Sequence, residues 1–344
     1  MERRLSIVFV LIIVGIILSV IKLKGFLLSL LGLSLGLVLV FLSSEPAVEG
    51  FKALSEYTGL SEYMVGNVSS LASNLPEIIL AIFMILSPHL REVAILTVML
   101  ASAFNGLLLG TLVIMLTYKG GSVEVPKEAL EYDIEVMRIT IAFSMIILGT
   151  GLILNLFDEK PYLPSEVFVF LLLAYASYLY FMSKRTRKMT KTIRRGREWV
   201  PYLVLGLIGI IVSAQLISNA SEHMVHELEL HVVIAATLIA FAGSVPEHFL
   251  AIIGARKGHI ELGISNLISG VVQSIMLVFP LLAIIMPVYL DGYVLYQFLA
   301  IASTLWITKK AIVDDRKLTL DEGVSIFITH LLGIVLFDEL SWLI

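Results

Sequence analysis

The chain has 344 residues, of which 58% are hydrophobic and 15% are charged, and its formal net charge is −4. With a mean hydropathy of +0.96, this composition excludes an ordinary soluble domain and predicts an integral membrane protein. The absence of cysteine excludes disulfides, thiolate metal sites and cysteine nucleophiles, so any metal ion must be held by oxygen or imidazole.

Apolar segments recur along the whole chain and are separated by short loops. Since a spanning helix needs about 20 mostly apolar residues, the pattern predicts an all-α protein with about eleven transmembrane helices. The first of them is expected to be retained, because no small-residue cleavage site follows it. The expected spans are 6–22, 26–46, 60–86, 91–117, 134–157, 163–182, 201–226, 231–254, 260–287, 291–308 and 322–340.

The basic residues are distributed unequally between the two sides of this arrangement. Of the 24 Lys and Arg residues, all but four fall on one side; the exceptions are Lys22, Lys24, Arg91 and Lys160. Positively charged loops stay in the cytoplasm. We therefore expect a prokaryotic cell-membrane protein with its amino terminus in the cytoplasm and its carboxyl terminus outside.

A basic segment at 183–200 is the one obvious linker in the chain. We interpret it as an orientation signal beside anionic lipid rather than as a regulatory or nucleic-acid-binding element. It separates an extra N-terminal helix at 1–25 and a first five-helix repeat at 26–182 from a second repeat at 201–344. The expected partners are the lipid bilayer and inorganic cations, with no nucleic acid.

The two halves share a weak internal repeat. Because each half contains five spans, the second copy is expected to be inverted, as in many secondary transporters, whose binding site lies near the membrane midplane where the copies meet. An offset of 170 residues places Ala72 on Ala242, Pro76 on Pro246 and Glu77 on Glu247.

Two glutamates lie in the middle of apolar spans, far from the span ends. A carboxylate at this depth costs about 2.5–3.5 kcal/mol, so it should face the protein interior and have a partner. The preceding proline lacks an N–H and frees the carbonyl four residues before it, which also needs a ligand. Such an oxygen-rich set suits calcium. The expected ligands are Glu77, Ser73, Asn74 and the carbonyl of Ala72, with Glu247, Ser244 and the carbonyl of Ala242.

The span that follows each glutamate has small and polar residues at its centre. Small residues permit close helix approach, and polar ones either bridge helices or line a pore. On their spacing from the glutamates, four residues are expected to face the site: Ser102 and Asn105 in the fourth span, and Ser269 and Gln273 in the ninth.

At these residues the sequence resembles the calcium/cation antiporter superfamily, whose two repeats each carry a small-polar-x-x-Glu motif and a following Gly/Ser/Asn-rich helix. The segments 243–248 (Gly-Ser-Val-Pro-Glu-His) and 269–273 (Ser-Gly-Val-Val-Gln) are most similar to the cation/proton exchanger branch. The Pro-Glu pairs at 76–77 and 246–247 are more similar to the sodium/calcium branch. The resemblance implies calcium binding at both glutamates and an extra first span before five plus five.

Charge balance favours protons as the counter-ion. Two ionised glutamates with one calcium ion are neutral, and so are two protonated glutamates without calcium, so either form can cross the midplane. We therefore expect calcium/proton antiport, with Glu77 and Glu247 carrying protons. His248 is expected either to tune Glu247 or relay a proton, or else to make a helix contact. Sodium/calcium exchange is the main alternative, a passive cation channel is another, and no cofactor is expected.

A polar segment at 219–231 contains His223 and His226 beside several glutamates. It could bind zinc or attract cations at a vestibule, but we interpret it as an exposed turn. The order is His-x-x-His-Glu rather than the His-Glu-x-x-His of zinc peptidases, and no Gly-x-Ser-x-Gly motif is found. We therefore expect a transporter and not an enzyme.

Overall fold

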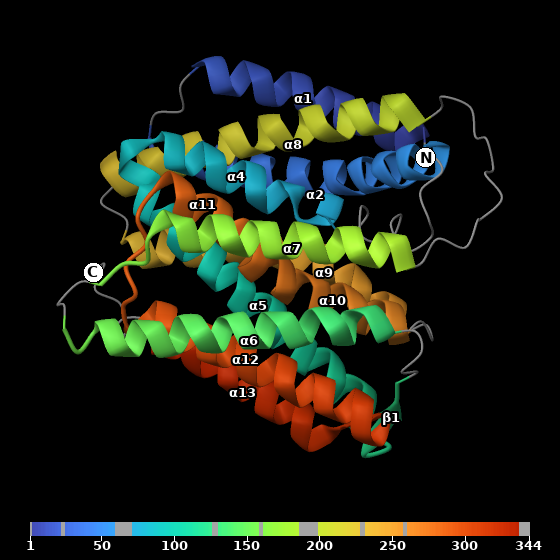
Figure 1. The fold of residues 1–344 in the computed structure, drawn as a ribbon. Helices are drawn as coiled ribbons and strands as arrows, with labels where there is room; N and C mark the ends of the chain where they lie inside the picture. Colours follow the sequence, from blue (N-terminus) through green and yellow to red (C-terminus); the bar gives the residue numbers. More distant parts are fainter. Residues whose placement is uncertain are drawn as a thin grey trace. The chain divides into compact units, whose positions relative to one another are not determined.

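The computed structural model describes residues 2–21, 25–58, 71–125, 130–157, 161–185, 199–227, 231–256 and 260–336 (Figure 1). Within these ranges the chain is mostly helical. The elements are α1 (Glu2–Ile21), α2 (Phe26–Tyr57), α4 (Leu75–Leu86), η1 (Pro88–Leu90), α5 (Arg91–Thr117), β1 (Ser122–Glu124), α6 (Glu131–Leu154), α7 (Ser165–Arg185), α8 (Trp199–Glu222), η2 (His223–Glu227), α9 (Val232–Arg256), α10 (Ile260–Gln273), η3 (Ser274–Val278), α11 (Phe279–Ile285), α12 (Gly292–Lys310), η4 (Ala311–Asp315), β2 (Lys317–Thr319) and α13 (Leu320–Val335).

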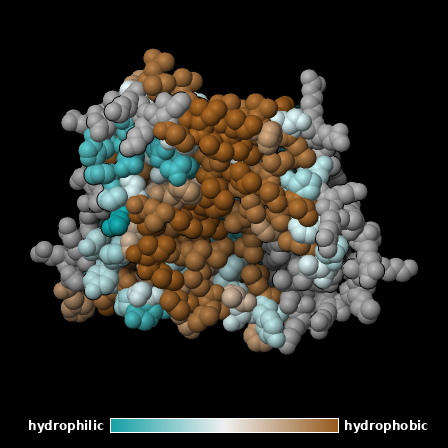
Figure 2. Space-filling model, turned by 90° about the horizontal axis from the view of Figure 1, so that it is seen from above, coloured by the Kyte–Doolittle hydropathy of each residue, from teal (hydrophilic) through white to brown (hydrophobic). Residues whose placement is uncertain are grey.

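Helices occupy the apolar segments that hydropathy singled out. Among the described residues, five are long and apolar enough to cross a membrane: Phe26–Ser55, Pro88–Thr117, Asp133–Leu154, Trp199–His226 and Gly263–Ile285. Figure 2 shows a face on which apolar residues cover the middle and hydrophilic ones gather toward the margins. A surface of this kind suits a lipid environment on the middle band and water at both edges.

The chain divides into two compact units, each of which combines segments from both halves of the sequence. Unit 1 comprises Met1–Thr97 and Leu179–Gly243, and unit 2 comprises Val98–Tyr178 and Ser244–Ile344. The units therefore differ in composition from the sequence repeats at 26–182 and 201–344. The basic linker at 183–200 lies outside the described residues between 186 and 198.

The core of unit 1 is built by α1, α2 and α8. Val8, Ile12 and Leu39 form a buried cluster, against which Leu205 and Val212 of α8 pack. The other faces of these helices carry exposed apolar side chains, including Phe9, Val10, Ile17, Val204, Ile208 and Ile211. Apolar residues on both faces are expected of helices that lie between protein and lipid.

Small residues bring α2 and α8 into very close contact. A Cβ atom on Gly206 would lie 2.5 Å from the backbone nitrogen of Ala47, and one on Gly50 would lie 2.6 Å from the Cα of Leu203. Further along, a Cβ on Gly36 would lie 2.7 Å from Ile217. Because the partner number falls as the α2 number rises, the helices run antiparallel. Backbone contact through small residues is a common way of packing helices in membranes.

The same contacts have an internal symmetry. An offset of 170 residues takes Gly36 to Gly206 and Ala47 to Ile217. The contact of Gly36 with Ile217 and the contact of Gly206 with Ala47 are therefore equivalent under this offset. Two antiparallel helices related by a two-fold axis would give this pattern. The offset is the one that places Glu77 on Glu247 in the sequence.

Unit 2 is held together by aromatic and glycine contacts. Phe279 of α11 makes edge-to-face contacts with Phe168 of α7 and Phe298 of α12, at centroid distances of 5.5 and 5.4 Å. Helices α5 and α13 approach through glycines from both sides, since a Cβ on Gly110 would lie 2.6 Å from the nitrogen of Phe327. These contacts fix the helix that carries Ser102 and Asn105.

The Lys and Arg distribution assigns each connecting segment to one side of the membrane. In both units, segments assigned to the same side contact each other. In unit 2, β1 pairs antiparallel with β2 on the predicted cytoplasmic side, and Leu290 donates to the carbonyl of Pro161 on the other side, at 2.9 Å. In unit 1, Gly25 donates to His223 at 2.8 Å, again on the predicted outer side. The pairing agrees with the order in which the spans were expected to alternate.

Several details differ from the sequence-based expectation. Helix α2 continues through Pro46 to Tyr57, because hydropathy marks the membrane-buried part of a helix and not its end. Strands β1 and β2 lie in segments treated as loops; each has only three residues, too few for an alternation pattern. The ninth span contains a π turn, η3, directly before Pro280, where the missing N–H favours such a distortion.

The α2–α8 contact gives a direct test of the packing. Gly206→Ala should lower the midpoint of thermal unfolding in detergent, because overpacking against backbone costs about 1–3 kcal/mol. Gly149→Ala is the matched control, since a Cβ at this position of α6 would meet nothing within 4 Å. Equal midpoints for the two variants would contradict the contact.

Candidate functional site

The first Pro-Glu motif lies where α4 begins. The backbone is helical at 71–73, forms a turn at Asn74 with φ −86° and ψ −3°, and is helical again from Leu75, with Pro76 in the first turn of α4. Proline is tolerated at this position because the first N–H groups of a helix have no intrahelical partner. Glu77 therefore occupies the first turn of a helix inside unit 1, and not the middle of an unbroken span.

The residues around this helix start are buried. Glu77 is 9% exposed, Ser73 7%, and Asn74 and Ala72 each 2%. The positive end of a helix dipole lies at the first turn and stabilises a carboxylate there. Asn74 occupies the N-cap position, but its side chain does not cap the helix. Ser73, Asn74 and Glu77 each have an interaction partner, so this part of unit 1 is a buried polar group in an apolar setting.

The second Pro-Glu motif lies in α9, which is helical from Val232 to Arg256 without interruption. Ser244 and His248 are fully buried in unit 2. The side chains of Ala242 and Glu247 lie outside the described residues. The two motifs thus share the Pro-Glu pair, but the first follows a turn and the second lies within a continuous helix.

His248 is anchored by a residue that was not among the expected ligands. Its Nδ1 lies 2.8 Å from Oδ1 of Asn266 on α10. Because an amide oxygen can only accept, Nδ1 carries the proton, and in the neutral ring Nε2 then carries the lone pair. That Nε2 atom is buried and has no hydrogen-bond partner among the described residues.

Gly270 creates the space in which three helices meet. A Cβ atom at this position of α10 would lie 2.9 Å from Cε1 and 3.1 Å from Nε2 of His248, and 3.1 Å from Nδ2 of Asn105 on α5. The absence of a side chain at Gly270 therefore lets His248 and Asn105 approach the same point. We call this point the Gly270 junction.

Polar atoms near the Gly270 junction lack partners. Both side-chain polar atoms of Asn105 and the hydroxyl of Ser102, one turn earlier on α5, are buried with no hydrogen-bond partner in the described part of the chain. Leaving a buried polar group unpaired costs about 1–3 kcal/mol, so such groups normally bind water or a ligand. Asn105, Ser102 and His248 are therefore candidate ligand-binding groups of unit 2.

The two expected residues on α10 are bonded to each other. Gln273 donates its Nε2–H to the hydroxyl of Ser269, at 2.8 Å. Ser274, one residue later, donates to the carbonyl of Gly270 at 2.9 Å, at the beginning of η3. Side chain and backbone polar groups are thus linked along one face of α10, next to the junction.

A second buried imidazole, that of His330, packs against α5. His330 of α13 is fully buried, and its Nε2 lies 2.8 Å from the hydroxyl of Thr304 on α12. Its ring lies against Gly106, where there is no room for a Cβ. Since Gly106 directly follows Asn105, this contact fixes the backbone that carries Asn105.

The structure thus brings together some of the expected residues. Asn105 and His248 meet at Gly270, and Ser269 is bonded to Gln273. The expected set did not include Asn266, Gly270 or His330. Asn266 and Gly270 belong to the polar segment 265–270 from which Ser269 was chosen, so their composition gave a signal. His330 stands alone in an apolar helix, and only its burial beside Thr304 and Gly106 distinguishes it.

Comparison with known proteins places this arrangement in a family. A model of the sodium/calcium exchanger protein family matches residues 28–184 and 199–343. The inner membrane protein YrbG of Escherichia coli (strain K12) is 25% identical over 277 residues, which cover 75% of this chain and 80% of YrbG.

Three solved structures share the fold. The H+/Ca2+ exchanger CAX has a TM-score of 0.74 at 16% identity, covering 98% of this chain and 88% of its own. YfkE has a TM-score of 0.65 at 18% identity, covering 96% and 99%. The sodium-calcium exchanger NCX_Mj has a TM-score of 0.62 at 19% identity, covering 89% and 97%. With its family match over both halves, the chain belongs to the sodium/calcium exchanger protein family, within the calcium/cation antiporter superfamily.

Proposed function

We propose that this protein is a secondary antiporter that exchanges calcium for protons by alternating access, with Glu77 and Glu247 acting on the same transported ion. The observation that carries the proposal is the buried carboxylate of Glu77 at the start of α4. A buried ionisable group in a membrane helix is costly to keep and marks an ion pathway in many transporters. Glu247 occupies the matching position of the second half.

The proposed ligands are hard oxygen donors. Ser73, Asn74 and the Ala72 carbonyl would accompany Glu77, and the Ala242 carbonyl and Ser244 would accompany Glu247. The helix that follows each glutamate would add neutral polar groups. Calcium takes six to eight oxygen ligands in a flexible geometry, which suits such a mixed set. The proposed contributions of these following helices are Ser102, Asn105, Ser269 and Gln273.

The inverted repeat is part of the same proposal. The symmetric α2–α8 contacts support it, because an inverted pair of helices must exchange its contacts under the repeat offset. Two helix pairs pack within one unit each, α2 with α8 and α6 with α12. In each pair, the two helices would occupy equivalent positions in the two halves. Rocking of such repeats around a fixed site is the usual form of alternating access.

The proton is proposed as the counter-ion on the basis of charge. Sodium exchange would bring several cations to the site, and the second half of α10 with the start of η3 supplies Gln273 and Ser274 rather than a further carboxylate. With two glutamates, one calcium or two protons restore neutrality. His248, whose Nε2 is a buried lone-pair donor beside Gly270, is proposed to take part in the proton step.

Sodium/calcium exchange remains the second candidate because of the Pro-Glu pairs. Leu75-Pro76-Glu77 and Val245-Pro246-Glu247 are more similar to the sodium/calcium branch, and the fold is shared with exchangers of both kinds. In either case we propose the same orientation, with the amino terminus in the cytoplasm.

The counter-ion can be tested with purified protein in liposomes. Calcium-45 uptake should follow an imposed proton gradient and should not respond to a sodium gradient of the same size. Uptake driven by sodium alone would reject proton coupling. Loss of a preset calcium gradient without any counter-ion would identify a channel instead.

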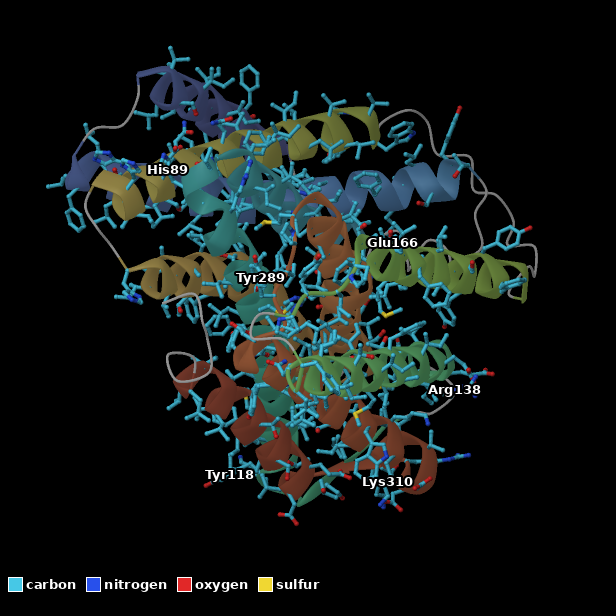
Figure 3. All side chains as sticks on the ribbon, turned by 60° about the vertical axis from the view of Figure 1, so that its left-hand side comes forward. His89, Tyr118, Arg138, Glu166, Tyr289 and Lys310 are labelled. Atoms are coloured by element: carbon cyan, nitrogen blue, oxygen red, sulfur yellow. The ribbon has the colours of Figure 1, made fainter. Side chains whose placement is uncertain are left out.

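The two glutamates can be tested in the same assay. Glu77→Gln and Glu247→Gln should each abolish gradient-driven calcium uptake, because removal of one charge leaves the bound calcium uncompensated in the membrane interior. Glu166→Gln is the matched control, since Glu166 is an exposed carboxylate on α7 (Figure 3). Normal uptake in either site variant would reject the site.

The Gly270 junction predicts a change in affinity. Gly270→Ala should displace Asn105 and His248, since the new methyl group would lie about as close as 2.9–3.1 Å to both side chains. We expect the calcium concentration at half-maximal uptake to rise by roughly tenfold, the equivalent of about 1.4 kcal/mol. Gly149→Ala should leave it unchanged. An unaltered value for Gly270→Ala in folded protein would exclude the junction from the site.

A further inference from the structure

Two histidines that are far apart in the sequence meet on the surface of unit 1. His89 lies in η1, the turn between α4 and α5, and His226 lies in η2 after α8 (Figure 3 labels His89). Their ring centroids are 4.1 Å apart, with an angle of 73° between the ring planes. Both side chains are exposed.

The structure distinguishes this pair from the one that spacing suggests. His223 and His226 are three residues apart, but Nε2 of His223 accepts the backbone N–H of Gly25 at 2.8 Å. The lone pair of that nitrogen is therefore already used. His89, which lies 137 positions before His226 in the chain, takes the place beside His226 instead.

We propose that His89 and His226 form a binding site for a transition-metal ion such as Zn2+, which clamps η1 to the end of α8. Neutral imidazole is a preferred ligand of zinc and related divalent ions, whereas calcium prefers oxygen. The pair would therefore select a class of ion different from the one that the antiporter is proposed to carry.

The geometry requires only a small adjustment. In a tetrahedral zinc site each imidazole nitrogen lies about 2.0–2.1 Å from the metal, so two ring centres lie about 5 Å apart. The observed distance between the ring centroids is 4.1 Å, and rotation of the two exposed side chains would bring it to the distance that zinc requires. Arg91, the first residue after η1, is engaged elsewhere, because its Nε–H donates to the carbonyl of Ile85 at 3.3 Å.

The site would be a weak and reversible one. Among the described residues there is no group of three His, Asp or Glu side chains that could hold a metal. Water must therefore complete the coordination shell, as it does at the open position of a catalytic zinc site. Such a site fits regulation better than permanent structural support.

The position of the pair connects it to the ion pathway. The turn η1 ends α4, whose first turn carries Glu77, and begins α5. Helices α4 and α8 pack against each other in unit 1. A metal that bridges His89 and His226 would restrain the far end of α4 against α8. An effect of this restraint on transport rests on the proposed exchange function, whereas zinc binding by the two histidines does not.

Binding can be measured by calorimetric titration of Zn2+ into detergent-solubilised protein without a purification tag. Loss of an outer-shell partner already weakens metal sites by about 10–100-fold, so His89→Gln and His226→Gln should each weaken zinc binding at least tenfold. His223→Gln and His231→Gln are the matched controls and should bind zinc normally. Weakening by His223→Gln but not by His89→Gln would overturn the proposal, as would equal binding by the unchanged protein and the double variant His89→Gln/His226→Gln.

The clamp has its own readout in liposomes. External Zn2+ should slow calcium-45 uptake by the unchanged protein and not by His89→Gln. Zinc binding without slower uptake would overturn the clamp. Absence of any gradient-driven uptake by the unchanged protein would instead reject the proposed exchange function, while the titration would still decide whether the two histidines bind zinc.

Discussion

Every polar group in the apolar interior of this protein must find its partner within the chain or in a bound ion or water, because hydrocarbon offers none. The Gly270 junction illustrates the constraint. His248 satisfies one ring nitrogen through Asn266, while its other nitrogen and the amide of Asn105 have no partner among the described residues. His248 is thus anchored at one nitrogen and unsatisfied at the other, and the unsatisfied amide of Asn105 lies beside the same glycine.

Glycine permits close approach at three separate contacts in this protein. Gly206 admits the backbone of α2, Gly106 admits the ring of His330, and Gly270 admits two polar side chains. In each case a side chain would meet atoms closer than van der Waals contact. Close packing through small residues therefore does two things in this protein: it joins helices that lipid does not drive together, and it brings polar groups to a shared point.

The sequence was most informative where one physical quantity decides the outcome. Hydropathy located the helices, since burial in lipid demands long apolar segments, and the uneven Lys and Arg distribution grouped the loops that contact each other. Features that depend on several helices at once could not be read in this way. The approach of Asn105 and His248 to one point depends on Gly270 of a third helix. The pairing of His89 with His226 depends on two turns far apart in the chain. The site residues themselves stay predictions.

The two Pro-Glu motifs have different backbone settings, which bears on mechanism. A turn at Asn74, whose φ and ψ stay in the right-handed helical region, separates α4 from the helical residues before it, whereas α9 continues through Pro246 without interruption. The Pro-Glu pair alone therefore does not dictate whether the helix is interrupted. In the proposed exchanger two inverted copies of one element must adopt different conformations whenever the site opens to a single side, because identical copies would make both sides equivalent. A Pro-Glu pair fits both settings: at the start of α4 the missing N–H of proline has no intrahelical partner to lose, and within α9 it leaves one carbonyl free.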